Sequence, residues 1–270
     1  MLKRVFITGG ASGLGKAIAM RYAREGHQVC IGDVNLERGA EAEAELKALQ
    51  PDSFFQLCDV RDENSILAVK DELMKRWRGV DIVVNNAGVG GTAGGIEEVS
   101  LADWDWVVDI NLMGVVRGCR VFTPVFKAQG DGYFVNIASA AGLMNAPKMA
   151  GYNVAKAGVI SLSETLRVEL SDDGIHTSVV CPAFFPTNLT ESLRSHQGGV
   201  QSAVNKLMKR SGVTAENVAD AIFDAVRKKQ FWVVTHKPEK RMWQLKRVMP
   251  DVFSFVMAYQ TKKFLAKKKA

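Results

Sequence analysis

The sequence predicts an α/β protein with a doubly wound parallel β-sheet enclosed between two helical layers. Three observations lead to this prediction. Short apolar segments alternate along the chain with longer segments of helical pattern. Most of the short segments are continuous runs of Val, Ile and Phe, which is typical of strands covered on both faces. Repeated strand–helix units of this kind connect parallel strands through right-handed crossovers.

The elements can be assigned in order along the chain. Seven short segments rich in β-forming residues are predicted as strands. They are residues 4–8, 28–33, 53–59, 81–85, 132–139, 176–181 and 231–235. The segments between them have helical spacing of apolar residues. They are residues 14–25, 37–49, 62–77, 103–128, 151–171 and 215–229.

Three connections are long, namely residues 86–102, 140–150 and 182–214. Each follows the carboxyl end of a strand, where open α/β sheets bind ligands, so we expect these loops to build a substrate pocket. No repeat, low-complexity segment or Pro/Ser-rich linker precedes residue 236. Residues 1–235 are therefore expected to form one domain, with residues 236–270 as a C-terminal extension.

The composition is that of an ordinary globular protein, but the charge is unevenly distributed. The chain is 47% apolar and 24% charged, with a formal net charge of +6. Residues 1–226 carry 22 basic and 27 acidic side chains, whereas residues 227–270 carry 13 basic and 2 acidic ones. No apolar run approaches the roughly 18 residues of a spanning helix, which excludes an integral membrane protein. The residues before Gly9 contain no apolar core of a signal peptide.

The cysteines predict a reducing environment. Four of them, Cys30, Cys58, Cys119 and Cys181, are widely separated, without the spacing of a metal site. Their apolar neighbours are typical of small buried thiols in a reducing cytosol. We therefore expect a cytoplasmic protein without a metal site.

A glycine-rich turn separates the first strand from the first helix. Gly9 permits the tight turn, Gly13 allows the backbone to approach a pyrophosphate, and Gly15 permits close helix–sheet packing. The N-terminus of helix 14–25 would present free N–H groups to the phosphates. This is the arrangement of a Rossmann fold, although a glycine turn without a ligand has the same sequence. The predicted contacts are Gly9, Ser12, Gly13, Leu14 and Gly15.

Two aspartates end the following strands. Asp33 is placed to accept hydrogen bonds from ribose hydroxyls, and the same carboxylate would repel a 2′-phosphate. No Arg or Lys follows in Val34-Asn35, so NAD is favoured over NADP. The alternative is that Asp33 caps the next helix. Asp59 and Val60 are similarly placed beside the adenine, although an Asp there is also a common helix N-cap.

A phenol and an ammonium lie four residues apart in helix 151–171. Tyr152 and Lys156 share one helix face, and a neighbouring cation would lower the pKa of the tyrosine. Such a phenol would be a general acid and base for alcohol–ketone chemistry. Ser139, at the end of the fifth strand, could hydrogen-bond the substrate oxygen. Taken alone, a Tyr-x-x-x-Lys pair is more often a stacking pair on a helix surface.

Six motifs in one register resolve this ambiguity. They are Thr8-Gly9-x-x-x-Gly13-x-Gly15, Asn85-Asn86-Ala87-Gly88, Asn111, Ser139, Tyr152-x-x-x-Lys156 and Pro182-Ala183-x-x-x-Thr187. Their order and spacing resemble those of the single-domain branch of the short-chain dehydrogenase/reductase family. The resemblance covers residues 4 to about 235, and one departure is Ala183, where many members have glycine.

The resemblance implies a role for each motif. Ser139 would polarise the substrate carbonyl, Tyr152 would transfer the proton, and Lys156 would bind the nicotinamide ribose and depress the tyrosine pKa. Asn111 would distort its helix and hold a water of a proton relay. The remaining implied cofactor contacts are Asn86, Ala87, Gly88, Pro182, Phe185 and Thr187. This intact set argues against an inactive relative, and the reaction needs no metal.

Apolar side chains dominate the predicted substrate loops. Besides Ser139 and Tyr152, the expected substrate contacts are Leu143, Met149, Phe184 and Leu189. Apolar walls around a few polar groups suit a hydrophobic secondary alcohol or ketone, although several of these residues would simply anchor their loops. The chain is therefore expected to be an NAD-dependent oxidoreductase. The alternative within the enzymes is a 3-oxoacyl-thioester reductase using NADPH.

The extension 236–270 mixes apolar and basic residues. Pro250 can begin a helix in which Phe253, Phe255 and Tyr259 mix with lysines. Such a helix can lie on an anionic membrane, whereas the simpler interpretation is docking on its own or a neighbouring subunit. A membrane- or partner-binding dinucleotide sensor is thus a function of another class. The family resemblance implies a homodimer or homotetramer, and the acidic body argues against nucleic-acid binding.

Overall fold

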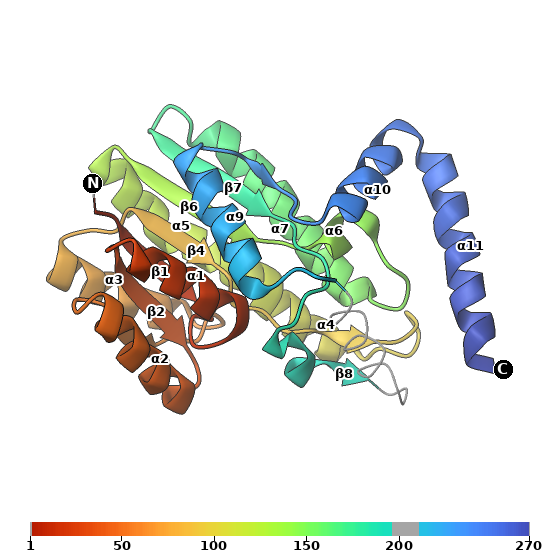
Figure 1. The fold of residues 1–270 in the computed structure, drawn as a ribbon, viewed down its shortest axis with the longest axis horizontal. Coiled ribbons are helices and arrows are strands. Elements are labelled where there is room, and N and C mark those ends of the chain that lie inside the picture. Colours follow the sequence, from red (N-terminus) through yellow and green to blue (C-terminus); the bar gives the residue numbers. More distant parts are fainter. Residues whose placement is uncertain (1, 196–210, 270) are drawn as a thin grey trace.

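A computed structural model describes residues 2–195 and 211–269. Seven parallel strands form one sheet with the order β3-β2-β1-β4-β6-β7-β9. The strands are β1 (Arg4–Thr8), β2 (Gln28–Asp33), β3 (Phe54–Leu57), β4 (Ile82–Asn85), β6 (Gly132–Ile137), β7 (Ile175–Val180) and β9 (Trp232–Val233). Every pair within this sheet is parallel, so the prediction of a doubly wound parallel sheet is confirmed (Figure 1).

Helices cover both faces of the sheet. Those that follow the strands are α1 (Gly13–Arg24), α2 (Leu36–Leu49), α3 (Glu63–Trp77), α4 (Leu101–Val108), α5 (Gly114–Gln129), α6 (Ala140–Met144), α7 (Ala150–Glu169) and α9 (Ala215–Arg227). The apolar residues of α1, α2 and α9 share one core cluster with one face of the sheet. Those of α3, α5 and α7 share a second cluster with the other face (Figure 1).

The alternation of strand side chains explains the continuous apolar runs. In β1, Val5 and Ile7 belong to the first cluster, whereas Phe6 belongs to the second. Neighbouring side chains of a strand point to opposite faces, so a strand buried on both faces must be apolar at every position. Residues 5–7 of β1 and 82–84 of β4 are buried in this way, and both strands carry loops of the site at their carboxyl ends.

A buried chain of polar side chains joins the middle of the sheet to α7. The Asn85 amide donates to Asn136 Oδ1 at 2.9 Å, and the Asn136 amide donates to Ser163 Oγ at 3.0 Å. Gly118 in α5 is packed so closely that a Cβ there would clash with Asn85. Both amide N–H groups thus have partners within the core, whereas the buried Oδ1 of Asn85 has none.

The prediction that the four cysteines are small buried thiols is confirmed. All four thiols are free and buried. Burial raises the pKa of both Cys58 and Cys119 to about 12, which keeps these thiols protonated at neutral pH.

Several local predictions were wrong in detail. The expected helix 103–128 consists of α4, a π-helical turn at Asp109–Met113, and α5, and the π turn lies where a distortion at Asn111 was expected. The connection 140–150 contains α6. The connection 182–214 contains a short 3-10 helix at Asn188–Ser192 and the strand β8 (Arg194–Ser195), while its residues 196–210 lie outside the described part. Strand β8 pairs with β5 (Thr92–Ala93) across about 100 residues, so no local pattern could predict either strand.

The extension forms two helices, α10 (Lys237–Val248) and α11 (Pro250–Lys269). The helix start at Pro250 is confirmed, whereas α10 was not predicted. Helix α10 contacts α6, and α11 leads away from the sheet toward the C-terminus (Figure 1). Phe253 is buried, while Phe255 remains exposed. Among the described residues, no helix has the length and apolar composition needed to cross a membrane.

An ion pair joins the first strand to the residue before β4. The Arg4 guanidinium donates to both carboxylate oxygens of Asp81 at 2.9 and 2.8 Å, and the Arg4 backbone N–H donates to the same group at 2.7 Å. Burial alone would raise the pKa of Asp81, but the hydrogen bonds and charge of Arg4 hold it below its ordinary value. The Arg4 side chain is 25% exposed and the Asp81 side chain 14% exposed, so solvent screens this pair only in part.

This pair predicts a pH-dependent contribution to stability. We expect Asp81→Asn to lower the free energy of unfolding by about 2 kcal/mol at neutral pH. Because the folded pKa of Asp81 is depressed, the difference from wild type should be present above pH ~4 and vanish as the pH falls through the folded value. Urea unfolding over a pH series measures it. Asp131→Asn is the control, because its pair with Lys3 is exposed; an equal loss in both variants would contradict the prediction.

Candidate active site

The glycine-rich turn lies at the carboxyl end of β1. Gly9 and Gly13 adopt positive φ angles of 63° and 51°, a conformation that favours glycine. A Cβ on Gly15 would clash with the Gly9 carbonyl and approach the Asn86 amide to 2.6 Å. The turn is therefore drawn tightly against the sheet, as was predicted for Gly15.

The N-terminus of α1 keeps its N–H groups free of side-chain capping. The side chain of its N-cap residue Ser12 makes no capping bond. By contrast, Asn35 caps α2 and Asp62 caps α3. Uncapped N–H groups at a helix start and the positive end of the helix dipole suit an anionic group. Leu14, the next predicted contact, is buried beneath this helix start and anchors it to the core.

Asn86 and Ala87 hold the turn from the end of β4. The Asn86 amide donates to the carbonyls of Thr8 and Gly9 at 2.9 and 3.1 Å. The Thr8 hydroxyl accepts the backbone N–H groups of Asn86 and Ala87, both at 3.0 Å. Two motifs far apart in the sequence are thus joined at the edge where the ligand is expected.

Asp33 lies beside the glycine-rich turn. It accepts the Ala11 backbone N–H at 3.1 Å and the Asn35 N–H at 3.0 Å. The alternative that Asp33 caps α2 is wrong, because Asn35 does so. Arg38, the first cation that follows, is paired with Glu191 at 3.0 Å.

Asp59 and Val60 end the third unit of the fold. Asp59 forms an ion pair with Arg61 at 2.6 Å, and the hydrogen bond from Arg61 lowers the pKa of its carboxyl. Asp59 is not the N-cap of α3, since that role belongs to Asp62. Val60 is buried against Gly114, and its carbonyl accepts a hydrogen bond from Arg117. Both residues follow the carboxyl end of β3, whose last residue Leu57 pairs with Asp33 of β2.

Asn111 lies in the π-helical turn between α4 and α5. Its side chain is fully buried, accepts the Val89 N–H at 2.7 Å and donates to the Val89 carbonyl at 2.9 Å. A Cβ on Gly88 would lie 3.0 Å from Asn111 Oδ1 and 3.6 Å from Lys156 Nζ. The segment after β4 therefore brings Asn111 and Lys156 to the same place, and π turns are frequent at functional sites.

Ser139, Tyr152 and Lys156 meet at the end of β6. Lys156 Nζ donates to the Ile137 carbonyl at 2.8 Å and lies 5.9 Å from the centre of the Tyr152 ring. Ser139 caps α6 and shares a side-chain hydrogen bond with Tyr152. Both Tyr152 and Lys156 are buried, which separates them from the surface stacking pair that the sequence left open.

Burial controls the acidity of this pair. It raises the pKa of Tyr152, against the opposing effect of the Ser139 hydrogen bond. It lowers the pKa of Lys156 to about 8. In the protein alone, desolvation of the phenolate is thus the largest effect on the tyrosine pKa. In this state Tyr152 is a phenol that keeps its proton. The expectation that Lys156 depresses this pKa beside a bound nicotinamide stays a prediction.

The turn after β7 closes the site from the other side. The Pro182 carbonyl accepts the Ala140 N–H at 2.8 Å and the Ser139 hydroxyl at 3.4 Å. A Cβ on Gly13 would lie 3.7 Å from Thr187, so this turn faces the glycine-rich turn. Phe185 is buried in the core between them.

One predicted substrate residue lies in the core, and the other three lie in the loops around the site. Leu143 is a core residue, so for it the anchoring interpretation holds. Met149 precedes α7, Leu189 lies in the 3-10 helix, and Phe184 is 39% exposed. Lys148 and Arg194, the cations that could meet an acidic substrate, are paired with Glu98 and Asp103.

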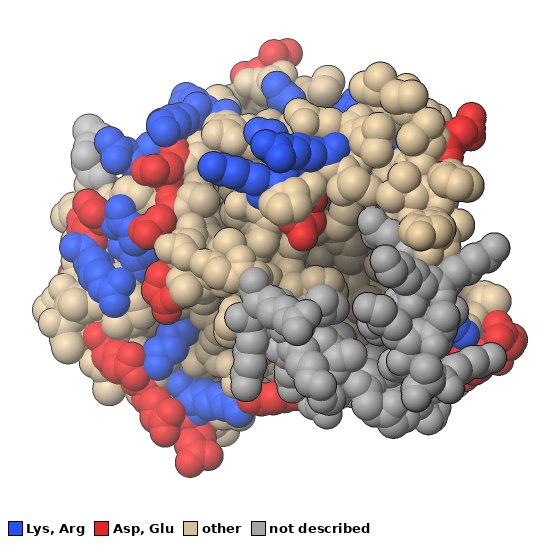
Figure 2. All heavy atoms as spheres, turned by 45° about the vertical axis from the view of Figure 1, so that its right-hand side comes forward, with Lys and Arg blue, Asp and Glu red and all other residues tan. Residues whose placement is uncertain are grey.

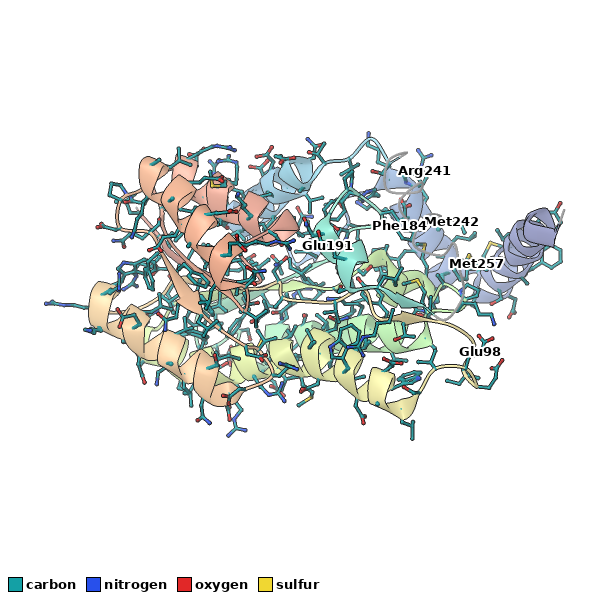
Figure 3. All side chains as sticks on the ribbon, turned by 90° about the horizontal axis from the view of Figure 1, so that it is seen from below. Glu98, Phe184, Glu191, Arg241, Met242 and Met257 are labelled. Atoms are coloured by element: carbon teal, nitrogen blue, oxygen red, sulfur yellow. The ribbon has the colours of Figure 1, made fainter. Side chains whose placement is uncertain are left out.

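The extension adds residues that the sequence reasoning missed. Met242 of α10 and Met257 of α11 lie at the same end of the molecule as Phe184 (Figure 3). Figure 2 shows a group of Lys and Arg side chains above a hollow in the surface, while the described surface beside the hollow is mostly uncharged. The apolar character of Met242 and Met257 was the only available signal in the sequence. No local pattern indicated that α10 packs against α6.

Comparisons with known proteins agree with this geometry. The family model described as short chain dehydrogenase matches residues 3–198. The probable oxidoreductase EphD of Mycobacterium tuberculosis is 30% identical over 92% of this chain. The chain spans only 43% of that relative's length. A 3beta-hydroxysteroid dehydrogenase of Mediterraneibacter gnavus is 34% identical over 70% of this chain and 68% of its own length.

Solved structures show the same architecture. A short-chain dehydrogenase/reductase from Burkholderia phymatum in complex with NAD superposes with a TM-score of 0.86. It is 31% identical, and the superposition covers 91% of this chain and 93% of that one. The family model, the sequence relatives and the solved structure thus all indicate the same family. This chain belongs to the short-chain dehydrogenase/reductase family of oxidoreductases.

Proposed function

We propose that the protein is an NAD-dependent dehydrogenase that interconverts a hydrophobic secondary alcohol and its ketone. The observation that carries this proposal is the meeting of Ser139, Tyr152 and Lys156 opposite a glycine-rich turn. A buried phenol that shares a hydrogen bond with a serine hydroxyl is placed to exchange a proton with an alcohol or carbonyl oxygen.

The residues of the turn fit a dinucleotide. Gly13 leaves open backbone beside the uncapped N-terminus of α1, and Gly15 lets the turn pack closely against Gly9 and Asn86. Diphosphate would be held there by backbone N–H groups. Asp33 would accept the ribose hydroxyls, since it already faces the turn through its bond to Ala11. Asp59, Val60, Asn86, Ala87 and Gly88 would line the adenosine and ribose side, and Pro182, Phe185 and Thr187 the nicotinamide side.

The catalytic residues would divide the remaining work. The nicotinamide supplies or accepts the hydride when it is bound. Ser139 orients the substrate oxygen, and Tyr152 donates its proton to that oxygen during reduction and recovers it during oxidation. Lys156 binds the ribose hydroxyls, and its pKa of about 8 lets it share in proton exchange near neutral pH. Asn111 positions the segment around Val89 beside Lys156.

The substrate side supports an apolar ligand. Phe184 and Met149 are only partly covered in the structure, and Met242 and Met257 lie at the same end of the chain (Figure 3). The cations that could attract an acid, Lys148 and Arg194, already have carboxylate partners. Apolar walls with a small polar centre suit a hydrophobic alcohol. We also expect a homo-oligomer, because α7 exposes Val154 and Val168.

A second candidate function concerns the outer face of the extension. Helix α11 buries Phe253 but exposes 74% of Phe255 and 62% of Tyr259. The sequence continues with five lysines, and α10 exposes four further cations. Apolar residues beside positive charge suit an anionic lipid surface, so we propose peripheral membrane contact through α11.

The first prediction concerns the proton-transfer residue. Tyr152→Phe should lower kcat by at least about 100-fold on a hydrophobic alcohol that the wild type oxidises with NAD⁺. The variant lacks the phenol hydroxyl that exchanges a proton with the substrate oxygen. Steady-state absorbance of the reduced cofactor measures it. Tyr22→Phe is the matched control, since it removes another buried hydroxyl, one without a hydrogen-bond partner. Full turnover by the Tyr152 variant would disprove the assigned role.

The second prediction concerns the choice of cofactor. Asp33→Asn should weaken NADH binding by about 10-fold and narrow the gap to NADPH, because it removes an ionised acceptor and a repulsive charge together. Fluorescence titration with both cofactors measures it, and Asp131→Asn is the control, because Asp131 is an exposed carboxylate paired with Lys3. Tighter binding of NADPH than of NADH by the wild type would favour the 3-oxoacyl-thioester reductase instead.

The third prediction concerns the membrane. Phe255→Ser should reduce co-sedimentation with vesicles rich in phosphatidylserine, because about 2 kcal/mol of apolar burial is lost. Leu101→Ser is the matched control, since Leu101 is 81% exposed on the body of the protein. Equal partitioning of wild type and both variants would exclude contact through α11.

A further inference from the structure

A buried histidine connects the extension to the active site. His236 lies between β9 and α10, where it is the N-cap residue of α10. Its side chain is buried, and its ring is tilted against that of Phe185 with centres 6.4 Å apart. The sequence motifs gave this residue no role, and no residue of the proposed proton transfer contacts it directly.

Both ring nitrogens of His236 bind the backbone of the turn after β7. The Ala183 N–H donates to Nδ1 at 3.2 Å, and Nε2 lies 3.2 Å from the Phe184 carbonyl. The hydroxyl of Thr235 also lies 2.9 Å from Nδ1. A backbone N–H only donates and a carbonyl only accepts, so Nδ1 must be the acceptor and Nε2 must carry the hydrogen. The contacts therefore require the neutral Nε2–H tautomer.

This turn is held between the histidine and the catalytic serine. On its other side, the Pro182 carbonyl receives hydrogen bonds from Ala140 N and from Ser139 Oγ. Three residues after Pro182 the chain reaches Phe185, and then Thr187 beside the glycine-rich turn. A loop carries few hydrogen bonds of its own, so side chains that bind its backbone determine its path.

A second tie fixes the far end of α10. Lys246, in the last turn of the helix, donates from Nζ to the Leu143 carbonyl at 2.7 Å. Leu143 belongs to α6, which begins directly after Ser139. Helix α10 is therefore bound at its start to the turn after β7 and near its end to the segment after β6. Its two anchor points are on the two loops that flank the reacting groups.

We propose that His236 is a positioning residue that fixes the turn Pro182–Phe185 for the nicotinamide. The inference rests on the proposed function, because that turn is assigned to the nicotinamide half of the cofactor. The adenosine half is bound by Asp33 and the turn after β1, which His236 does not contact. Loss of His236 should therefore disturb one half of the cofactor and leave the other unchanged.

Three variants of the full-length protein separate the contributions of the ring. His236→Phe keeps an aromatic ring against Phe185 but removes both hydrogen bonds. His236→Asn retains an acceptor near the position of Nδ1. His27→Phe is the matched control, because His27 Nδ1 accepts the Lys3 N–H at 3.0 Å on the opposite edge of the sheet. Each variant is titrated with NADH and with ADP-ribose, which lacks the nicotinamide, and kcat is measured.

The expected result is a split between the two ligands. His236→Phe should weaken NADH binding by about 10-fold and lower kcat, because two hydrogen bonds to the turn are lost. Its affinity for ADP-ribose should stay within about twofold of wild type. His236→Asn should recover part of the NADH affinity, and His27→Phe should match wild type for both ligands.

Two results would overturn the inference. One is an equal loss of NADH and ADP-ribose affinity in His236→Phe, which would show a general structural role. The other is NADH affinity and kcat in that variant equal to those of the His27 control. Failure of the wild type to bind NADH is a separate result, since it would overturn the proposed function and the inference with it.

Discussion

The site depends on the close approach of the first strand–helix turn to the end of β4. Gly15 leaves no room for a Cβ between the Gly9 carbonyl and the Asn86 amide, and that amide donates to both Thr8 and Gly9. This contact draws the N-terminus of α1 onto the carboxyl edge of the sheet. It also sets the position of the segment after Asn86, which carries Gly88 and Val89 to Asn111 and Lys156. One steric constraint thus places the glycine-rich turn and the candidate catalytic groups relative to each other.

Desolvation gives the catalytic pair its chemical character. Burial holds the proton on Tyr152 and brings the pKa of Lys156 to about 8. The Lys156 ammonium is nevertheless satisfied by the Ile137 carbonyl, so the buried charge has a hydrogen-bond partner. Burial thus brings Lys156 close to the point of proton exchange and keeps Tyr152 protonated, while the hydrogen bond between Asn85 and Asn136 stiffens the sheet beneath them. Perturbed acidity in a cleft is typical of functional sites.

The sequence predicts the central sheet well, because its strands are buried on both faces and its glycines are needed for close contact. It predicts which residues the site would use, since Asn111, Ser139, Tyr152 and Lys156 fall in family register, and the structure brings them together. Three features could not be predicted from the sequence. The pair β5–β8 exists only through long-range contact, the pKa of Tyr152 depends on burial, and the return of α10 toward the site depends on His236 and Lys246. None of these leaves a periodic or local signal.

The uneven charge of the chain follows the division between the body and the C-terminal extension. The acidic body contains the sheet and the candidate catalytic groups, whereas the basic extension contacts that body through α10 and points α11 outward. In the proposed reaction, hydride passes between the cofactor and the carbinol carbon of an apolar alcohol. Mass spectrometry of the cofactor, after turnover of an alcohol deuterated at that carbon, measures this transfer directly. Direct hydride transfer places deuterium in the reduced nicotinamide, and reduced cofactor without deuterium would show that the hydride does not come from that carbon.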